Sequence, residues 1–217
     1  MTDVDKLVIA ILGGTGDQGR GLAHQFAKAG QQVIIGSRSA ERAQAAAGEL
    51  GMGIRGMANG EAARNADVVI AAIPWEGHKE LLTGLAGDLE GKIVVDCVNP
   101  LGFGDRGPYA LDVAEGSAAE QAAALLSGSR VVAAFHHVSA RLLLDPEIAS
   151  FDLDVLVLGD DRAATDLVQA LAARIPGMRG VYAGRLRNAR QVEALTANLI
   201  AINRRYKVHA GLRITDI

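Results

Sequence analysis

The chain has 217 residues, 22 Lys and Arg against 25 Asp and Glu, and a single cysteine, Cys97. A chain of this length buries about 70% of its unfolded surface, so it needs no cross-links in order to fold. One cysteine excludes an internal disulfide framework and is consistent with a reducing compartment. No run approaches the ~18 apolar residues of a membrane span, and the stretch from Met1 to Lys6 lacks the basic start of a signal peptide. We therefore expect a soluble, cytoplasmic protein.

The charge is distributed unevenly along the chain. Residues 179–217 contain eight Lys or Arg and two acids, which gives this part a net charge of +6 and leaves −9 on the rest. A basic C-terminal part on an acidic body indicates either an anionic partner near that end or a subunit contact between the two parts. Nucleic acid is a less suitable partner, because the chain is acidic overall and its basic residues are not interleaved with aromatic ones.

Short apolar runs alternate with amphipathic stretches along the whole chain. The runs predict strands at residues 7–12, 32–36, 68–73, 92–98, 131–135, 153–158 and 180–183. The stretches between them predict helices at residues 19–29, 40–49, 76–84, 118–126, 162–174 and 188–207. Strands separated by helices are typical of an α/β fold, here a Rossmann-type doubly wound parallel sheet. We expect this domain over residues 1–180 and a small C-terminal helical segment that closes the site over residues 181–217.

Local polar patterns predict two helix starts and one loop. Ser117 and Glu120 have the spacing of a capping box. Asp160 or Asp161, directly after Gly159, is predicted to be a helix N-cap rather than a metal ligand. Residues 101–108 are expected to form a glycine-rich loop after a strand, long enough to shape a site.

A glycine motif directly follows the first predicted strand. Gly14, Gly16 and Gly19 fit the pattern G-x-G-x-x-G between an apolar run and an amphipathic stretch. In this pattern the three glycines allow a tight turn, close approach of the backbone to a pyrophosphate, and close packing of the helix on its strand. The helix start then offers free N–H groups and a positive dipole end to an anion. The motif predicts a dinucleotide-binding protein.

The end of the second predicted strand indicates which dinucleotide is bound. Ser37 stands 23 residues after Gly14, near the position where NAD-binding proteins place an Asp or Glu on the ribose 2′-hydroxyl. This chain instead has the hydroxyl of Ser37, the guanidinium of Arg38, and Arg42 one helical turn further on. Such groups suit a 2′-phosphate, which a carboxylate would repel. The pattern favours NADP, the alternative being ordinary surface arginines at an exposed strand end.

Other candidate residues follow later strands, whose carboxyl ends face the cofactor crevice in this architecture. Trp75 is predicted either to flank the nicotinamide half of the cofactor or to pack in the protein, and Asn99 reaches the same edge. His136 and His137 follow the strand at 131–135 and are equally consistent with a structural or a catalytic role. No matching set of Cys, His or carboxylate residues accompanies them, so a metal site is not expected.

Six segments of the chain resemble, in order, those of the F420-dependent NADP reductases. They are residues 13–21, 36–38, 73–76, 117–120, 159–161 and 186–196. The glycine motif is common to many Rossmann proteins, whereas its combination with Ile73, Pro74 and Trp75 and with the C-terminal helix motif is more specific. The NADPH-binding domain of the STEAP metalloreductases shares part of the pattern, but those proteins add a membrane domain.

The resemblance implies hydride transfer between C4 of the nicotinamide of NADP(H) and C5 of the deazaflavin coenzyme F420, in a homodimeric enzyme. It places the NADP site at Gly14, Thr15, Gly16, Asp17, Gln18, Gly19, Ser37, Arg38 and Arg42. It places the nicotinamide end at Ile73, Pro74, Trp75, Asn99 and Ala140, and the deazaflavin near His136, Gly211 and Leu212. The phosphodiester and glutamate tail of F420 would give the basic C-terminal part, in particular Arg187 and Arg190, an anionic ligand.

One residue departs from the family pattern, and two other functions stay open. Asp17 stands where a neutral residue such as Asn is expected, and a carboxylate beside a pyrophosphate is unfavourable unless it caps the helix. Both cofactors bring their own reactive carbons, so the protein is expected to orient them without a nucleophile, His136 being a possible exception. The alternatives are an NADPH-dependent imine or hydroxyacid reductase, which usually has a larger helical domain, and a non-enzymatic NADP-sensing module.

Overall fold

The computed structural model describes residues 4–217, and part of the N-terminal stretch considered above, Met1 to Asp3, lies outside this range. The strands are β1 (Val8–Leu12), β2 (Gln32–Ser37), β3 (Arg55–Ala58), β4 (Val68–Ala71), β5 (Ile93–Asp96), β6 (Leu101–Gly104), β7 (Gly107–Ala110), β8 (Arg130–Ala133), β9 (Leu153–Gly159) and β10 (Met178–Gly184). The α-helices are α1 (Asp17–Lys28), α2 (Ala40–Leu50), α3 (Asn59–Arg64), α4 (His78–Leu89), α5 (Ala118–Leu125), α6 (Ala140–Leu143), α7 (Arg162–Ala172) and α8 (Ala189–Tyr206). Three short 3₁₀ helices are η1 (Val4–Lys6), η2 (Trp75–Gly77) and η3 (Leu186–Asn188).

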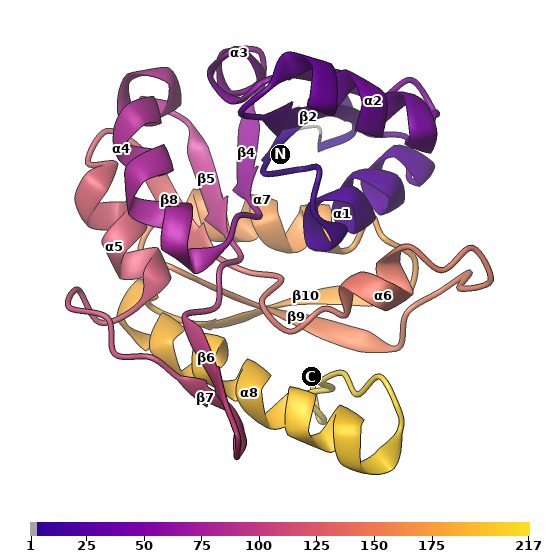
Figure 1. Cartoon of the computed structure of the whole chain (residues 1–217), viewed down its shortest axis with the longest axis vertical. Coiled ribbons are helices and arrows are strands. Elements are labelled where there is room, and N and C mark those ends of the chain that lie inside the picture. The colour runs from indigo at the N-terminus through magenta and orange to yellow at the C-terminus, as the bar shows by residue number, and fades with distance from the viewer. Residues whose placement is uncertain (1–3) are drawn as a thin grey trace.

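Eight strands form one sheet in the order β10-β9-β8-β5-β4-β1-β2-β3, with helices on both faces (Figure 1). The chain order reverses at β1, as in a doubly wound α/β fold, and the predicted fold class is confirmed. The sheet departs from parallel pairing where β8 meets β9, with Val132 opposite Gly159. The connection over residues 134–152 contains only the short α6, so β9 runs back beside β8 without a crossover helix.

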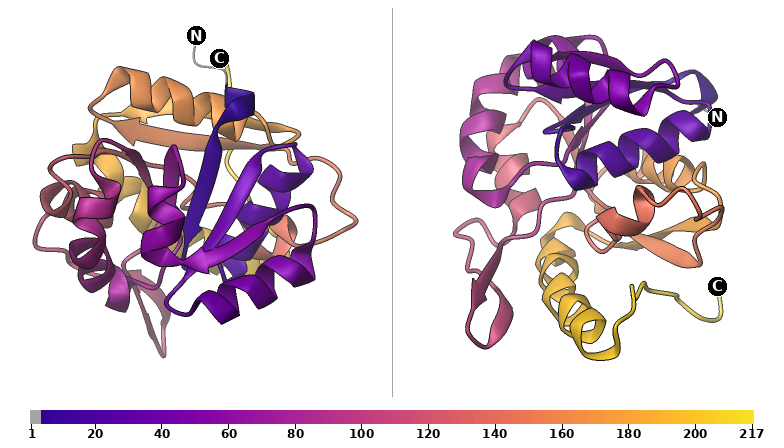
Figure 2. Two further views of the ribbon diagram at one scale, coloured as in Figure 1. Left: turned by 90° about the horizontal axis from the view of Figure 1, so that it is seen from above. Right: turned by 45° about the vertical axis from the view of Figure 1, so that its right-hand side comes forward.

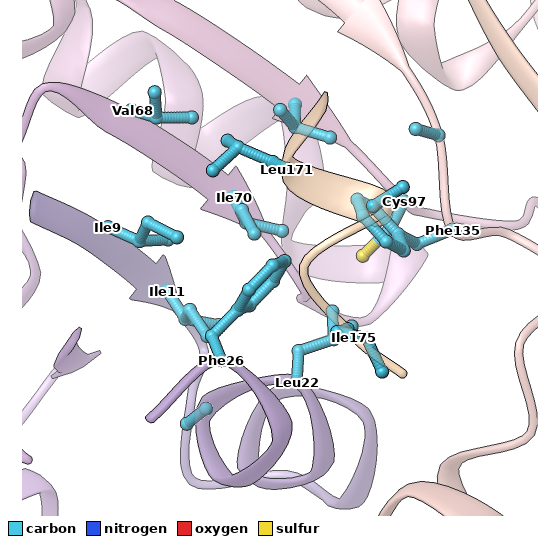
Figure 3. Packing of buried hydrophobic residues seen from close by; sticks show 14 of the residues in the cluster. Ile9, Ile11, Leu22, Phe26, Val68, Ile70, Cys97, Phe135, Leu171 and Ile175 are labelled. Carbon is cyan, nitrogen blue, oxygen red and sulfur yellow. The ribbon is translucent and has the colours of Figure 1, made fainter. Parts of the chain in front are cut away.

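Two apolar layers hold the helices on the sheet. On one face, α1, α2 and α7 pack on strand side chains such as Ile9, Ile11 and Ile70. On the other face, α3, α4, α5 and the start of α8 pack on alternate side chains of the same strands. Phe26 of α1 points toward Ile70 and meets Phe135 edge to face, with ring centroids 6.0 Å apart (Figure 3). Burial of each large apolar side chain contributes about 1.5–3 kcal/mol to the stability of the fold. The two layers therefore hold α1 firmly against the sheet.

The glycine-rich segment at residues 101–108 is a β-hairpin, so the prediction of a loop is wrong there. Strands β6 and β7 pair antiparallel, with Leu101 opposite Ala110 and Gly104 opposite Gly107. The ring of Tyr109 occupies the space where a side chain on Gly102 would lie, so the glycine serves cross-strand packing rather than a loop. Figures 1 and 2 show the hairpin beside α8, below the main sheet, and β7 contacts this helix.

The predicted helix caps are present. The Asp161 side chain accepts a hydrogen bond from Ala164 N at 2.7 Å and begins α7, and Ser117 accepts from Glu120 N at 3.0 Å and begins α5. Within residues 4–217, the chain forms no helix both long and apolar enough to cross a membrane.

Candidate functional site

A cleft of about 1060 Å³ opens at the carboxyl ends of the central strands. Segments that follow β1, β2, β4, β5 and β8 line it, together with the hairpin and one face of α8. Most of the residues singled out from the sequence line this cleft: Thr15, Gly16, Asp17, Gln18, Ser37, Arg38, Arg42, Ile73, Pro74, Trp75, Asn99 and His136. Segments far apart in the sequence thus contribute to one concave surface of the size that ligand sites have.

Of the residues assigned above to the NADP site, its nicotinamide end and the deazaflavin, five do not line the cleft. Gly14 and Gly19 are buried in the turn and at its contact with α1. Ala140 begins α6, which packs beside α1. Gly211 and Leu212 run beside β9, where Leu212 O accepts a hydrogen bond from Asp154 N at 2.7 Å. Their proposed ligand contacts stay predictions.

The glycine turn has the backbone geometry that an anion site requires. Gly13 takes the left-handed conformation, with φ +68°, and Gly14 N donates to Gly36 O at 3.0 Å, so the turn is fixed on β2. A Cβ at Gly14 would lie 2.7 Å from Ile11 O, and one at Gly19 would lie 2.6 Å from the Cα of Gly14. These two glycines therefore serve packing inside the protein. A Cβ at Gly16 would meet no atom closer than 3.6 Å, so this glycine faces open space in the cleft.

The N-terminus of α1 points its free N–H groups toward the same space. The N-cap, Gly16, has no side chain to accept their hydrogen bonds, so a ligand anion can accept them. Asp17 is exposed in the first turn, where the helix dipole favours a carboxylate, and it does not cap the helix. Gln18 Nε2 donates to Phe135 O at 3.3 Å, which links the glycine turn to the end of β8.

Two arginines, Arg38 and Arg42, stand at one end of the cleft. Ser37 ends β2 and is buried, whereas Arg38 and Arg42 are exposed and, within the described chain, form no ion pair. Ser39 fixes the start of α2 because its hydroxyl accepts from Arg42 N at 3.2 Å. The guanidinium groups are therefore free to bind a phosphate beside β2.

Asn59 lies at the same end of the cleft and could not be found from its local sequence. It begins α3, is 7% exposed, and its Oδ1 atom has no hydrogen-bond partner in the described residues. This side chain occupies the space above Gly36, where a Cβ would lie 2.8 Å from Asn59 Oδ1. Neither α3, which carries Asn59, nor β3, which directly precedes it, was predicted.

At the other end of the cleft, hydrogen bonds join three elements. Asn99 Nδ2 donates to His136 O at 2.9 Å, while the hydroxyl of Thr196 on α8 lies 3.3 Å from Asn99 Oδ1 and 3.2 Å from His136 O. Trp75 is half-buried and lies over His78, with ring centroids 5.5 Å apart. Thr196 lies in the C-terminal segment 186–196 that resembles the family, but the sequence did not predict that its side chain reaches the cleft.

His136 lines this end of the cleft and has a buried ring. The residue is 3% exposed, and neither ring nitrogen has a hydrogen-bond partner in the described residues. Burial lowers the pKa of the imidazole to about 4, although Asp96 opposes this, so the ring is neutral near pH 7. The preceding Phe135 adopts a positive φ of 64°, a strained conformation held by its packing on Phe26. His137, in contrast, binds Asp154 O at 2.7 Å and does not line the cleft.

The described residues contain no group of three or more His, Cys, Asp or Glu side chains that could hold a metal ion. Cys97 lines the cleft but is 6% exposed, and its thiol lies 3.1 Å from Ala71 O. Burial raises the pKa of this thiol strongly, with a further contribution from the charge of Asp96. Cys97 therefore stays a thiol and offers no thiolate for metal binding or nucleophilic attack.

Comparison with known proteins identifies the family. A family model described as NADP oxidoreductase, coenzyme F420-dependent, matches residues 8–100. The F420-dependent NADP reductase of Methanothermobacter thermautotrophicus is 40% identical over 229 aligned residues, which cover 100% of this chain and 98% of that protein. A solved structure of a candidate F420-dependent NADP reductase from Arthrobacter sp. FB24 has a TM-score of 0.84 and 28% identity and covers 97% of this chain and 100% of its own.

A more distant neighbour shares only the fold. The imine reductase BcSIRED from Bacillus cereus BAG3X2 has a TM-score of 0.67 and 18% identity, and the match covers 93% of this chain but 63% of that one. The full-length identity to the Methanothermobacter reductase shows the family, and the free N–H groups and exposed arginines of the cleft agree with it. The chain belongs to the family of F420-dependent NADP reductases.

Proposed function

We propose that this protein transfers a hydride between NADP(H) and coenzyme F420 in the cytoplasm. The observation that carries the proposal is the composition of the cleft described above, which has anion-binding groups at one end and, at the other, a neutral imidazole without a hydrogen-bond partner in the described residues. Full-length relatives named F420-dependent NADP reductases support both ligands.

The anion-binding end suits the phosphates of NADP. The N–H groups at the start of α1 would hold the pyrophosphate, and the open space at Gly16 allows its close approach. The hydroxyl of Ser37 and the guanidinium groups of Arg38 and Arg42 would hold the 2′-phosphate. Asn59 would contact the adenosine half that lies between these two groups.

The other end suits the reacting rings. The two cofactors supply the carbon atoms between which the hydride moves, so the protein has to align them and exclude water. Trp75, Asn99 and Thr196 would form the walls of this end. His136 is neutral and can donate one hydrogen bond and accept another without repelling the positively charged nicotinamide.

The C-terminal part would bind the anionic tail of F420 and close the site. Thr196 and Ile200 of α8 line the cleft, which supports a closing role for residues 181–217. The two arginines named above for the tail differ in their contacts. Arg190 Nη2 lies 2.7 Å from Asp112 Oδ1, whereas Arg187 has no ion pair in the described chain. Arg187 is therefore the better candidate for the tail.

Steady-state kinetics tests the proposal. The protein is mixed with NADPH and oxidised F420, and the visible absorbance of the deazaflavin is followed; we expect it to disappear. The variant Arg38→Ala should raise KM for NADP(H) by about ten- to a hundredfold, the effect of losing one charged hydrogen bond, and change KM for NAD(H) little.

The matched control is Arg141→Ala, which removes an exposed arginine outside the cleft and should change neither KM. If both ligands bind but no turnover occurs, the proposed hydride transfer would be refuted, and a non-enzymatic NADP-sensing module would be favoured. Equal effects of Arg38→Ala on NADP(H) and NAD(H) would contradict the placement of the 2′-phosphate.

A further inference from the structure

A chain of polar side chains lies buried behind the reacting-ring end of the cleft. His78, the first residue of α4, places Nε2 2.6 Å from Asp96 Oδ2 at the end of β5, and both side chains are 0% exposed. Its Nδ1 lies 2.9 Å from Oε1 of Gln121 on α5, and Gln121 Nε2 donates to Glu115 Oε2 at 3.1 Å. Of these four residues, Glu115 alone is exposed.

The order of donors and acceptors sets the protonation of His78. The carboxylate of Glu115 can only accept, so Gln121 donates to it through Nε2 and faces His78 with its acceptor oxygen. Nδ1 of His78 therefore carries a proton. Nε2 shares a second proton with the carboxylate of Asp96, so His78 and Asp96 form a buried ion pair.

This pair supports two walls of the cleft. The ring of Trp75 lies over the His78 ring with 32° between their planes, within the range of a cation–π contact. The second oxygen of Asp96 accepts from Val98 N at 3.0 Å and fixes the turn that leads to Asn99. The same ion pair thus holds side chains from both η2 and the end of β5.

Other charged and titratable groups surround the pair. Glu193 of α8 accepts hydrogen bonds from Ala118 N and Ala119 N at 2.9 and 3.1 Å, and burial raises the pKa of this carboxyl to about 7. Glu115 faces the pair through Gln121, with Lys79 of α4 near it. His136, after β8, and Cys97, after β5, face Asp96.

The location of the pair indicates a role in the site. A buried ion pair contributes little net stability, because desolvation of both charges offsets their attraction. We propose that His78, as the imidazolium partner of Asp96, is a positioning residue that holds Trp75 and the Asn99 turn in the orientation that receives the nicotinamide. The naming of the nicotinamide as the ligand of this end rests on the proposed function.

The charged state of His78 is maintained against its burial. Burial alone would favour the neutral ring, but the hydrogen bond and the negative charge of Asp96 outweigh it and raise the pKa of His78 above its ordinary value. Gln121 and Glu193 act in the same direction. The imidazolium beneath Trp75 therefore persists to a higher pH than that of a free histidine.

Trp75 is the one tryptophan of the chain, so its fluorescence reports on His78. An imidazolium quenches indole fluorescence more strongly than a neutral imidazole does. We expect the emission of the wild-type protein to rise in one step, at a pH above the one at which a free histidine loses its proton. Asp96→Asn should move that step to lower pH and His78→Gln should abolish it. The control His24→Gln, which alters a histidine of α1 outside the cleft, should keep the wild-type step.

The affinities for two ligands distinguish a loss of Trp75 positioning from a general loss of protein structure. 2′,5′-ADP fills only the adenosine and phosphate end of the cleft, and NADP extends to Trp75. In His78→Gln we expect the Kd of 2′,5′-ADP to stay within about twofold and that of NADP to rise about tenfold, the scale of a lost cation–π contact. Asp96→Asn should likewise weaken the binding of NADP and not that of 2′,5′-ADP. This variant tests the proposal if His78→Gln does not fold.

A step that persists in His78→Gln, or a wild-type step at or below the ordinary pH of an imidazole, would overturn the proposal. Equal losses for the two ligands, or no loss for NADP, would overturn it as well. None of these measurements requires turnover with F420. A wild-type protein that binds NADP but does not reduce F420 would therefore refute the proposed function and leave the role of His78 to be judged separately.

Discussion

The motif glycines serve two different purposes, which single substitutions can separate. A methyl group at Gly19 would overlap the backbone of Gly14, whereas one at Gly16 has room inside the protein and obstructs only a ligand. We expect Gly16→Ala to unfold at the wild-type temperature and to bind NADP at least about tenfold more weakly. Gly19→Ala should lose about 1–3 kcal/mol of stability through overpacking.

Thermal unfolding and calorimetric titration of both variants check this prediction. A Gly16→Ala protein with wild-type affinity for NADP would mean that no phosphate approaches the turn. A stable Gly19→Ala protein would mean that α1 can move away from β1 without cost.

At the scale of residues, sequence reasoning found the groups that follow strands directly. Ser37, Arg38 and Asn99 lie in the cleft because the carboxyl ends of parallel strands meet at one edge. Asn59 could not be found in this way, because a buried amide has no local signature and the short helix that carries it was not predicted. The support of Trp75 by His78 likewise depends on α4 meeting β5, which spacing along the chain does not show.

At the scale of elements, one buried carboxylate holds the C-terminal tail on the sheet. Asp154 of β9 is 0% exposed and accepts hydrogen bonds from two nitrogens of Arg179 at 2.8 Å, from Arg213 Nη1 at 3.1 Å and from Ile214 N at 2.7 Å. The hydrogen bonds of Arg179, with its charge and that of Arg213, lower the pKa of Asp154 to about 2. The tail is therefore anchored beside β9 as long as this carboxyl is ionised.

We expect Asp154→Asn to lower the free energy of unfolding by about 2 kcal/mol, the effect of weakening charged hydrogen bonds, and to speed amide exchange in residues 208–217. The folded pKa of Asp154 is below its ordinary value of 3.8, so its contribution is complete above about pH 4 and is lost as the pH falls toward 2. Denaturant unfolding at neutral pH and across the acid range measures both effects.

The matched control is Asp152→Asn, because Asp152 is exposed and pairs with Arg213 at the surface. Its loss should change stability by less than about 1 kcal/mol. If Asp154→Asn kept wild-type stability and exchange, the tail would be held by other contacts.

Elements with strong apolar periodicity were predicted, and those without it were missed. The central strands are continuous aliphatic runs and form at the predicted places, although β4, β5 and β8 each end two residues before the predicted ranges do. Strand β3 contains Gly56 and Met57 between Arg55 and Ala58 and has no such pattern. The hairpin was predicted to be a loop because its glycines, of which Gly102 makes room for Tyr109, are also typical of loops.

At the scale of the whole molecule, we propose that the protein forms a homodimer through the hairpin and α8. Phe103 and Tyr109 on the hairpin and Ile202 and Tyr206 on α8 are large apolar side chains exposed by 39% or more, and the two elements lie together (Figures 1 and 2). Burial of such a surface between two copies would remove it from water.

Sedimentation should give twice the mass of the 217-residue chain at micromolar concentration. Tyr206→Asp should shift the protein toward the monomer, whereas Met52→Asp, at another exposed apolar residue, should not. A wild-type protein that sediments as a monomer at every concentration would refute the dimer.

The central claim is direct transfer of a hydride between two cofactors in one cleft. The measurement that tests it most directly uses NADPH labelled with deuterium at the transferred position of C4, with oxidised F420 as the acceptor in ordinary water. We predict that mass spectrometry finds the deuterium in reduced F420, because the hydride passes between the two carbons without exchange with solvent. Reduced F420 without deuterium, formed while the label is released to water, would contradict the account.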